Sequence, residues 1–202
     1  MDFSFSYKKN TTGTTGPQAP GVSHGQDQYE KLRGCGIVLT KPHGWYDISR
    51  GKRDETFAKR PYAALLLLMA SEKEYGEFWA SSVVLVPACE APGETELTDA
   101  YNHLKRLVGD EVPMGDGSAS TNYETNGLTF TAEVNSNSET WDLEPGDLMT
   151  QMLTKVGGLL AAAGPMRLAR HTLPEGSLLV YMTPSDLRDL ADTTKLEWTV
   201  LE

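Results

Sequence analysis

The segment from Asp147 to Ala163 constrains the fold more than any other part of this sequence. Its apolar residues recur every three or four positions, as they do along one side of an α-helix. Asp147 suits the start of this helix, and Gly164 with Pro165 suits its end. Because the apolar stripe is wide, the helix has to pack against other elements of a core. The stripe consists of Leu148, Met149, Met152, Leu153, Val156, Leu159, Leu160 and Ala163.

Two glycines, Gly157 and Gly158, lie inside this predicted helix. Each costs up to about 1 kcal/mol relative to alanine in a helix interior. Two interpretations are open. Either the glycines allow another backbone to approach closely, or the helix is weakened at this point.

The rest of the chain combines a second helix with several strands. Residues 97–108 repeat apolar side chains at helical spacing, whereas residues 128–134 alternate as a half-buried strand does. The helices and strands do not alternate regularly, so we expect an α+β fold: a single domain with a mixed, mostly antiparallel sheet and two main amphipathic helices. The other predicted elements are strands at 36–40, 78–86 and 196–200, a hairpin at 166–182, a short helix at 183–191, and loops at 110–126 and 135–139.

Two apolar runs in the first half are harder to interpret. Residues 62–70 contain Ala and Leu, which favour helix, but the run is short and is followed by polar residues as in a hairpin. Periodicity does not decide between helix and strand here. Residues 83–86 are all apolar, which is typical of a central strand covered on both faces.

The first 27 residues differ from everything that follows. Phe3, Phe5 and Tyr7 alternate with Ser4 and Ser6, which is the pattern of one short strand. The following tract is rich in Thr, Gly and Pro and offers almost nothing that could be buried. We therefore predict an extended or disordered N-terminal arm over residues 1–27 and a single globular α+β domain over 28–202.

Net charge limits the classes of partner. The chain has 18 Lys and Arg against 28 Asp and Glu, a formal net charge of −10. Such a chain is repelled by phosphate backbones, which argues against a nucleic-acid partner. The longest apolar run, residues 62–70, is about half the length that spans a bilayer, so we expect no membrane insertion. A cytoplasmic location is expected, or a virion if the protein is an assembly subunit.

No segment forms a recognised catalytic, cofactor or metal motif, and we assign no residue to these roles. Cys35 lies between two glycines, eight residues before His43, which suggests a cysteine-dependent hydrolase. The competing interpretation, a buried structural cysteine, is favoured because an apolar strand is predicted directly after it. The four histidines, His24, His43, His103 and His171, show no metal-ligand spacing.

A basic cluster stands out against the acidic background. It spans residues 50–60, directly after Trp45 and Tyr46, and aromatic residues are enriched at binding surfaces. Its cations are Arg50, Lys52, Arg53, Lys59 and Arg60. The cluster could contact an acidic protein surface or a phosphate, or its charges could pair with Asp54, Glu55 and the acidic remainder of the chain.

These patterns favour a non-enzymatic, protein-binding or assembly subunit, as in a virion or another large particle. Its N-terminal arm would add a strand to the sheet of a neighbour. The alternatives are an acidic immunity-type or inhibitor protein that covers a basic toxin or nuclease, and the cysteine-dependent hydrolase. The predicted partner-binding residues are Phe3, Phe5, Tyr7, Trp45, Tyr46, Arg50, Lys52 and Arg53.

Overall fold

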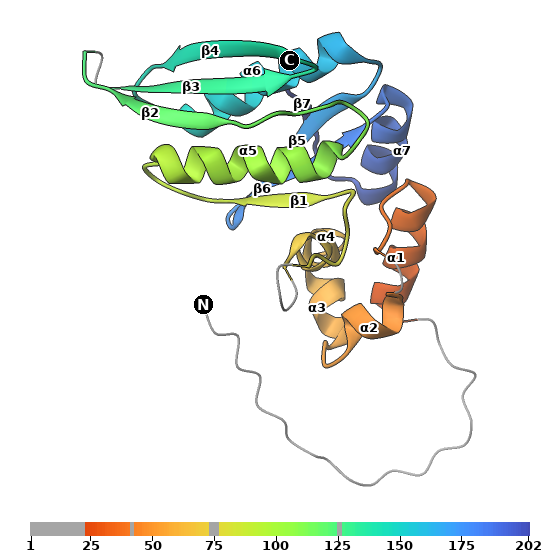
Figure 1. Ribbon diagram of the computed structural model, residues 1–202. Coiled ribbons are helices and arrows are strands. Elements are labelled where there is room, and N and C mark those ends of the chain that lie inside the picture. The colour runs from red at the N-terminus through yellow and green to blue at the C-terminus, as the bar shows by residue number, and fades with distance from the viewer. Residues whose placement is uncertain (1–22, 41–42, 73–76, 125–126) are drawn as a thin grey trace, which may run out of the picture.

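A computed structural model describes residues 23–40, 43–72, 77–124 and 127–202 (Figure 1). The fold is α+β, as predicted, and both of its sheets are antiparallel. The strand predicted at Phe3–Tyr7 lies outside the described residues. The large sheet has the order β1 (Val84–Pro87), β6 (Gly176–Met182), β5 (Arg167–Leu173) and β7 (Thr199–Val200). The small sheet has the order β2 (Ser118–Asn122), β3 (Gly127–Val134) and β4 (Asn137–Leu143).

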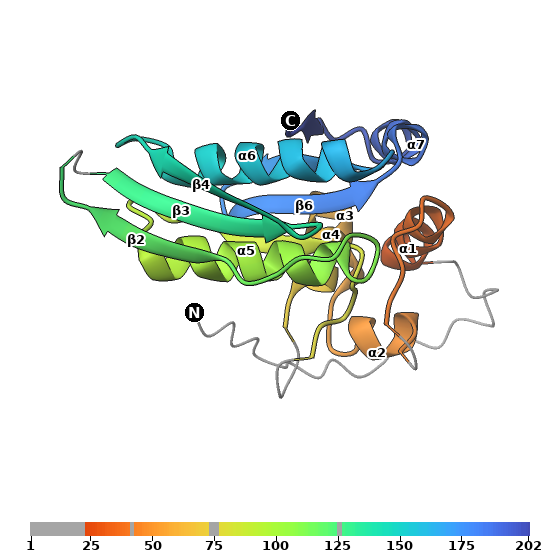
Figure 2. The same cartoon turned by 45° about the horizontal axis from the view of Figure 1, so that its top comes forward.

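The two longest helices lie between the two sheets (Figures 1 and 2). These are α5 (Glu94–Val108) and α6 (Leu148–Ala163), which match the two predicted amphipathic helices. Five shorter helices cover the other face of the large sheet, so the small sheet and this helical layer lie on opposite sides of the molecule. They are α1 (His24–Gly34), α2 (Trp45–Ser49), α3 (Asp54–Lys59), α4 (Ala63–Ala70) and α7 (Pro184–Thr194).

The helix α6 buries half of its predicted apolar stripe, and the remaining stripe residues are half-buried or, at Ala163, exposed. Met152, Leu153, Val156 and Leu160 are fully buried in the core between the two sheets. A Cβ atom added at Gly157 would overlap the carbonyl oxygen of Leu201. The structure therefore supports close backbone approach as the reason for this glycine, since the C-terminal segment crosses the helix there.

The large sheet has a core on each face. Leu179 and Tyr181 of β6 face the cluster that contains α5 and α6, whereas Leu178 and Val180 face the cluster formed with the short helices. Two-sided burial explains why β6 is almost continuously apolar. The apolar run of residues 83–86 is likewise covered on both faces, but β1 lies at the edge of the sheet rather than at its centre.

Several predicted boundaries change in the first half of the chain. Residues 63–70 form α4, and its apolar composition follows from burial of Leu65, Leu66 and Met69 against the large sheet. The predicted strand at 78–86 shrinks to β1. The predicted strand at 36–40 contributes one isolated bridge, between Leu39 and Ala80.

The helix α1 begins within the predicted arm. The Ser23 hydroxyl accepts a hydrogen bond from the Gln26 N–H and caps the helix. The Asp54 carboxylate accepts two more, from the N–H groups of His24 and Gly25. Residues 24–27 are therefore helical rather than extended, and the undescribed N-terminal segment ends at residue 22.

Both predicted loops of the middle region contain strands. β2 lies inside the predicted loop 110–126, and the predicted loop 135–139 is reduced to a two-residue turn at Asn135 and Ser136. These two residues have φ of 52° and 62°, as in the type I′ turns of tight hairpins. The tight turn allows β4 to begin at Asn137. The last predicted strand, 196–200, is likewise reduced to β7.

Candidate protein-interaction site

The small sheet has one apolar and one polar face. Its inner face carries Leu128, Phe130, Ala132 and Val134 of β3, which are buried against α5 and α6. The outer face carries hydroxyl, amide and carboxyl side chains from all three strands. Period-two alternation in β3 places the two sets on opposite faces.

Side-chain hydrogen bonds connect the strands across the outer face. The hydroxyl oxygens of Thr131 and Thr140 lie 2.9 Å apart, and the Thr129 hydroxyl donates to the Asp142 carboxylate at 2.7 Å. The Asn122 amide donates to the same carboxylate at 3.1 Å. The hydroxyl of Thr129 and the amide of Asn122 hold the pKa of the Asp142 carboxyl below its ordinary value.

The backbone of β4 is open along its outer edge. In a hairpin with a two-residue turn, the flanking residues Val134 and Asn137 exchange backbone hydrogen bonds, and every second pair repeats this. The intervening residues of β4, Ser138, Thr140 and Asp142, therefore direct their N–H and C=O groups away from β3. In the part of the chain that the structure describes, no further strand pairs with this edge.

A side chain of α6 closes the far end of this edge. The Gln151 amide nitrogen donates to the Glu144 carbonyl at 2.9 Å, and its amide oxygen accepts from the Glu144 N–H at 3.1 Å. Gln151 thus makes the two backbone bonds that a neighbouring strand would make. The open segment is limited to residues 138–142, which we call the β4 edge.

One outward position of the opposite edge of the same sheet, at Thr121, is blocked. The Thr121 N–H of β2 donates to the Glu94 carboxylate of α5 at 2.7 Å, and the Thr121 hydroxyl donates to the same oxygen at 2.6 Å. A charged side chain that occupies an edge position is a common protection against strand pairing. We call this protected edge the β2 edge.

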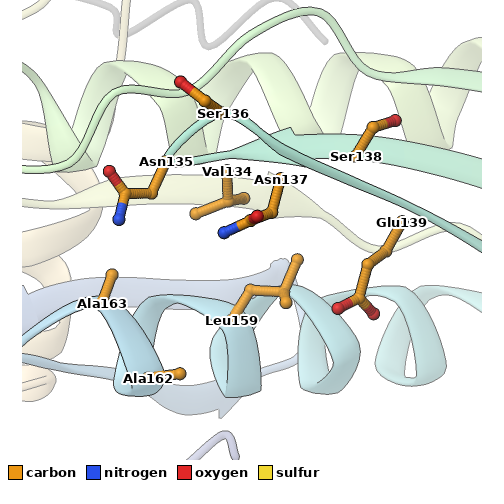
Figure 3. A pocket seen from close by; sticks show the side chains of 9 residues that line it. All are labelled: Val134, Asn135, Ser136, Asn137, Ser138, Glu139, Leu159, Ala162 and Ala163. Atoms are coloured by element: carbon orange, nitrogen blue, oxygen red, sulfur yellow. The ribbon is translucent and has the colours of Figure 1, made fainter.

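A groove lies beside the β4 edge, between the β3–β4 hairpin and the last turns of α6 (Figure 3). Its volume is about 460 Å³. Asn137 and Glu139 reach down from the hairpin toward Leu159, Ala162 and Ala163 on the helix. The alanines are exposed and Leu159 is half-buried, so the helical floor is apolar, whereas polar side chains of the hairpin form most of the groove lining. An open strand edge beside an apolar floor is suited to an extended segment whose alternate side chains are apolar.

The predicted partner-binding residues have different environments. Phe3, Phe5 and Tyr7 lie outside the described residues. Trp45 is half-buried in the helical layer, stacked on Tyr29 with ring centroids 6.0 Å apart and packed against Phe57. Its ring therefore contributes mainly to packing within the helical layer.

The basic cluster remains at the surface. Tyr46 is 79% exposed, and Arg50, Lys52 and Arg53 are also exposed. Asp54, one of the carboxylates expected to pair with them, caps α1 instead. The N–H of Gly25, followed by that of His24, holds the pKa of this carboxyl below its ordinary value. Arg60, at the end of the cluster, instead forms an ion pair with Glu175. The other ion pairs among the described residues involve cations outside the cluster.

The environment of Cys35 favours a structural role. Its half-buried thiol donates to the Thr193 hydroxyl at a sulfur–oxygen distance of 3.4 Å. The His43 ring packs edge-on against Trp79, with centroids 5.4 Å apart. Within the described ranges, no group of three or more His, Cys, Asp or Glu is placed to hold a metal ion. No helix in these ranges is long and apolar enough to cross a membrane.

No family model matches the chain, and comparisons with curated proteins and with solved structures also find no match. The functional argument therefore depends on the geometry of the chain itself. The strongest geometric feature is the contrast between the open β4 edge and the blocked β2 edge.

Proposed function

We propose that the protein is a non-enzymatic assembly subunit whose N-terminal arm binds a neighbouring copy by strand addition. The observation that carries the proposal is the open β4 edge. An unpaired strand edge is a template for another extended chain, and proteins usually block such edges. Glu94 occupies the outward N–H of Thr121 at the β2 edge, whereas no group among the described residues pairs with the three outward backbone positions of β4.

The energetics favour a contact of modest strength. Ordering five arm residues costs roughly 5–10 kcal/mol, at about 1–2 kcal/mol per residue. Burying three aromatic side chains offsets about 5–9 kcal/mol, at about 1.5–3 kcal/mol each. Backbone hydrogen bonds add about 0.5–1.5 kcal/mol each. These terms nearly cancel, and association costs a further ~4–15 kcal/mol, so a single arm contact is weak and assembly depends on protein concentration. A virion or another large particle, in which many such contacts act together, fits this behaviour.

The exposed basic surface of Tyr46, Arg50, Lys52 and Arg53 is proposed as a second contact. Its cations lie on the helical layer, and no described carboxylate neutralises them. An acidic protein surface is its expected partner.

Removal of the arm tests the proposal. We would delete residues 1–22 and keep Ser23, because its hydroxyl caps α1. Light scattering over a dilution series should show a concentration-dependent mass for the full chain and the mass of one chain for the deletion. Circular dichroism of both proteins controls for folding. An unchanged mass after the deletion would contradict the assembly function and favour the acidic inhibitor alternative.

A further inference from the structure

We propose that the acceptor of the arm is the β4 edge of a second copy, where Phe3–Tyr7 becomes the fourth strand of the small sheet. This inference rests on the proposed assembly function and specifies its binding site. Three features support it: the backbone groups of the edge, the chemistry of the two faces of the sheet, and the position of the arm in the fold.

The backbone of the β4 edge matches a short segment. Ser138, Thr140 and Asp142 offer three outward pairs of N–H and C=O groups, and Gln151 occupies the next position, at Glu144. An antiparallel strand that uses all three open positions spans five residues of β4. Ser4–Lys8, which overlaps the alternating segment Phe3–Tyr7 in four residues, is five residues long and supplies three alternate polar residues.

The two faces of the arm match the two faces of the sheet. Side chains of paired residues point to the same face of a sheet. If Ser4 and Ser6 pair with outward-facing β4 residues, their hydroxyls extend the polar face that carries Thr140 and Asp142. The aromatic rings then point to the inner side, which carries Glu139, Trp141 and Leu143 of β4. A shift of the arm by one residue would turn the serines to the inner face and the aromatic rings to the polar face. The serines, and not the aromatic residues, are therefore expected to pair with the outward-facing residues of β4.

Charge favours one of the two antiparallel registers that use all three open positions. Asp2 opposite Asp142 would bring two carboxylates together, so the favoured register places Ser4 opposite Asp142, Ser6 opposite Thr140 and Lys8 opposite Ser138. The Ser4 hydroxyl can then donate to the Asp142 carboxylate. Lys8 and Lys9 lie near the exposed carboxylate of Glu139, which adds charge complementarity.

The position of α1 favours a second copy over the same chain. The arm precedes α1, and α1 belongs to the layer on the opposite side of the large sheet from β4 (Figures 1 and 2). The segment from Asn10 to Val22 reaches at most about 45 Å when fully extended, which is sufficient to bridge to an adjacent subunit.

A matched pair of proline substitutions in the full chain tests this site. Thr140→Pro removes an outward N–H from the β4 edge, and Thr121→Pro removes the corresponding outward N–H from the β2 edge. By light scattering, T140P should have the mass of one chain at concentrations where T121P and the unmodified chain assemble. If T140P assembles normally while the arm deletion does not, the β4 acceptor is wrong and the assembly function stands.

A disulfide test covers the case in which T140P fails to fold. Chains with Ser6→Cys and chains with Thr140→Cys are mixed under oxidising conditions, both with Cys89→Ser because Cys89 is exposed. Paired residues have Cα atoms about 5.5 Å apart, within disulfide range. A cross-linked dimer should form on a non-reducing gel, and Thr121→Cys in place of Thr140→Cys should give none. Equal yields at both positions, or no dimer with Thr140→Cys, would overturn the proposal.

Discussion

The two edge strands of the small sheet, β2 and β4, both pair with β3. They differ in how far their outer backbone groups are available to another strand. At the β2 edge, the Glu94 carboxylate occupies the outward N–H of Thr121. At the β4 edge, Gln151 closes the position at Glu144, and no other described residue pairs with the outward groups of Ser138, Thr140 and Asp142. The difference shows that a sheet edge is protected by individual side chains from adjacent helices. Removing or adding one such side chain can therefore redirect assembly.

The largest expected loss of stability comes from a core substitution in α6, the helix that packs against the small sheet and so supports both of its edges. Leu153→Ala in α6 empties a fully buried position in the core between the sheets, and it should lower the free energy of unfolding by about 2–5 kcal/mol. Leu159→Ala on the same helix is the matched variant. Leu159 is half-buried beside the groove, so its loss should affect arm binding more than stability. Urea unfolding and light scattering of both variants separate the two effects. Equal losses of stability would mean that Leu159 belongs to the core.

The next effect comes from unblocking the β2 edge. Glu94→Ala leaves the Thr121 N–H without its acceptor, and it should cost about 1–3 kcal/mol of stability. It should also create a second open edge and raise the mass of the assemblies. Glu94→Gln keeps an acceptor oxygen and serves as the control. If the masses of both variants equal that of the unmodified protein, Glu94 does not protect the edge.

A smaller loss of stability is expected from a substitution that separates the role of the β4 backbone in assembly from the role of its side chains. Thr140→Val removes the hydroxyl that pairs with Thr131 but keeps the outward N–H, so stability should fall by only about 0.5–1.5 kcal/mol. Assembly should persist, in contrast to Thr140→Pro. Loss of assembly in T140V, measured by light scattering, would mean that the hydroxyl contributes to the arm contact.

The smallest effect is a pH dependence of the small sheet. Hydrogen bonds from Thr129 and Asn122 lower the pKa of the Asp142 carboxyl in the folded protein. A lowered pKa stabilises the fold above the unfolded value of about 3.9, and this contribution disappears as pH falls through the folded value. Asp142→Asn should therefore flatten the pH dependence of urea unfolding below about pH 4. An unchanged slope would show that the carboxylate does not contribute.

Much of the fold follows from sequence periodicity. The helices α5 and α6, the strand β3 and the β5–β6 hairpin were predictable because each has a clear apolar face or a clear turn. The four short helices before β1 were harder. The distant Asp54 carboxylate caps α1, and α4 is apolar on every side. Such contacts do not appear in local periodicity.

The candidate site was predictable only in part. The arm was identified from its alternating residues, but the acceptor edge was missed because residues 135–139 were interpreted as a loop. The available signal was the Asn135-Ser136 pair directly after β3, followed by Trp141 and Leu143 alternating with Thr140 and Asp142. The openness of the edge could not be predicted, because it depends on where Gln151 and Glu94 lie in space.

Amide hydrogen exchange tests the central claim most directly. The amides of Ser138, Thr140 and Asp142 should exchange slowly in the full chain at assembly concentration and rapidly after deletion of residues 1–22, because the arm supplies their hydrogen-bond acceptors. The Thr121 amide, which donates to Glu94, should be equally protected in both proteins. If the three β4 amides exchange at the same rate with and without the arm, the β4 edge does not bind it.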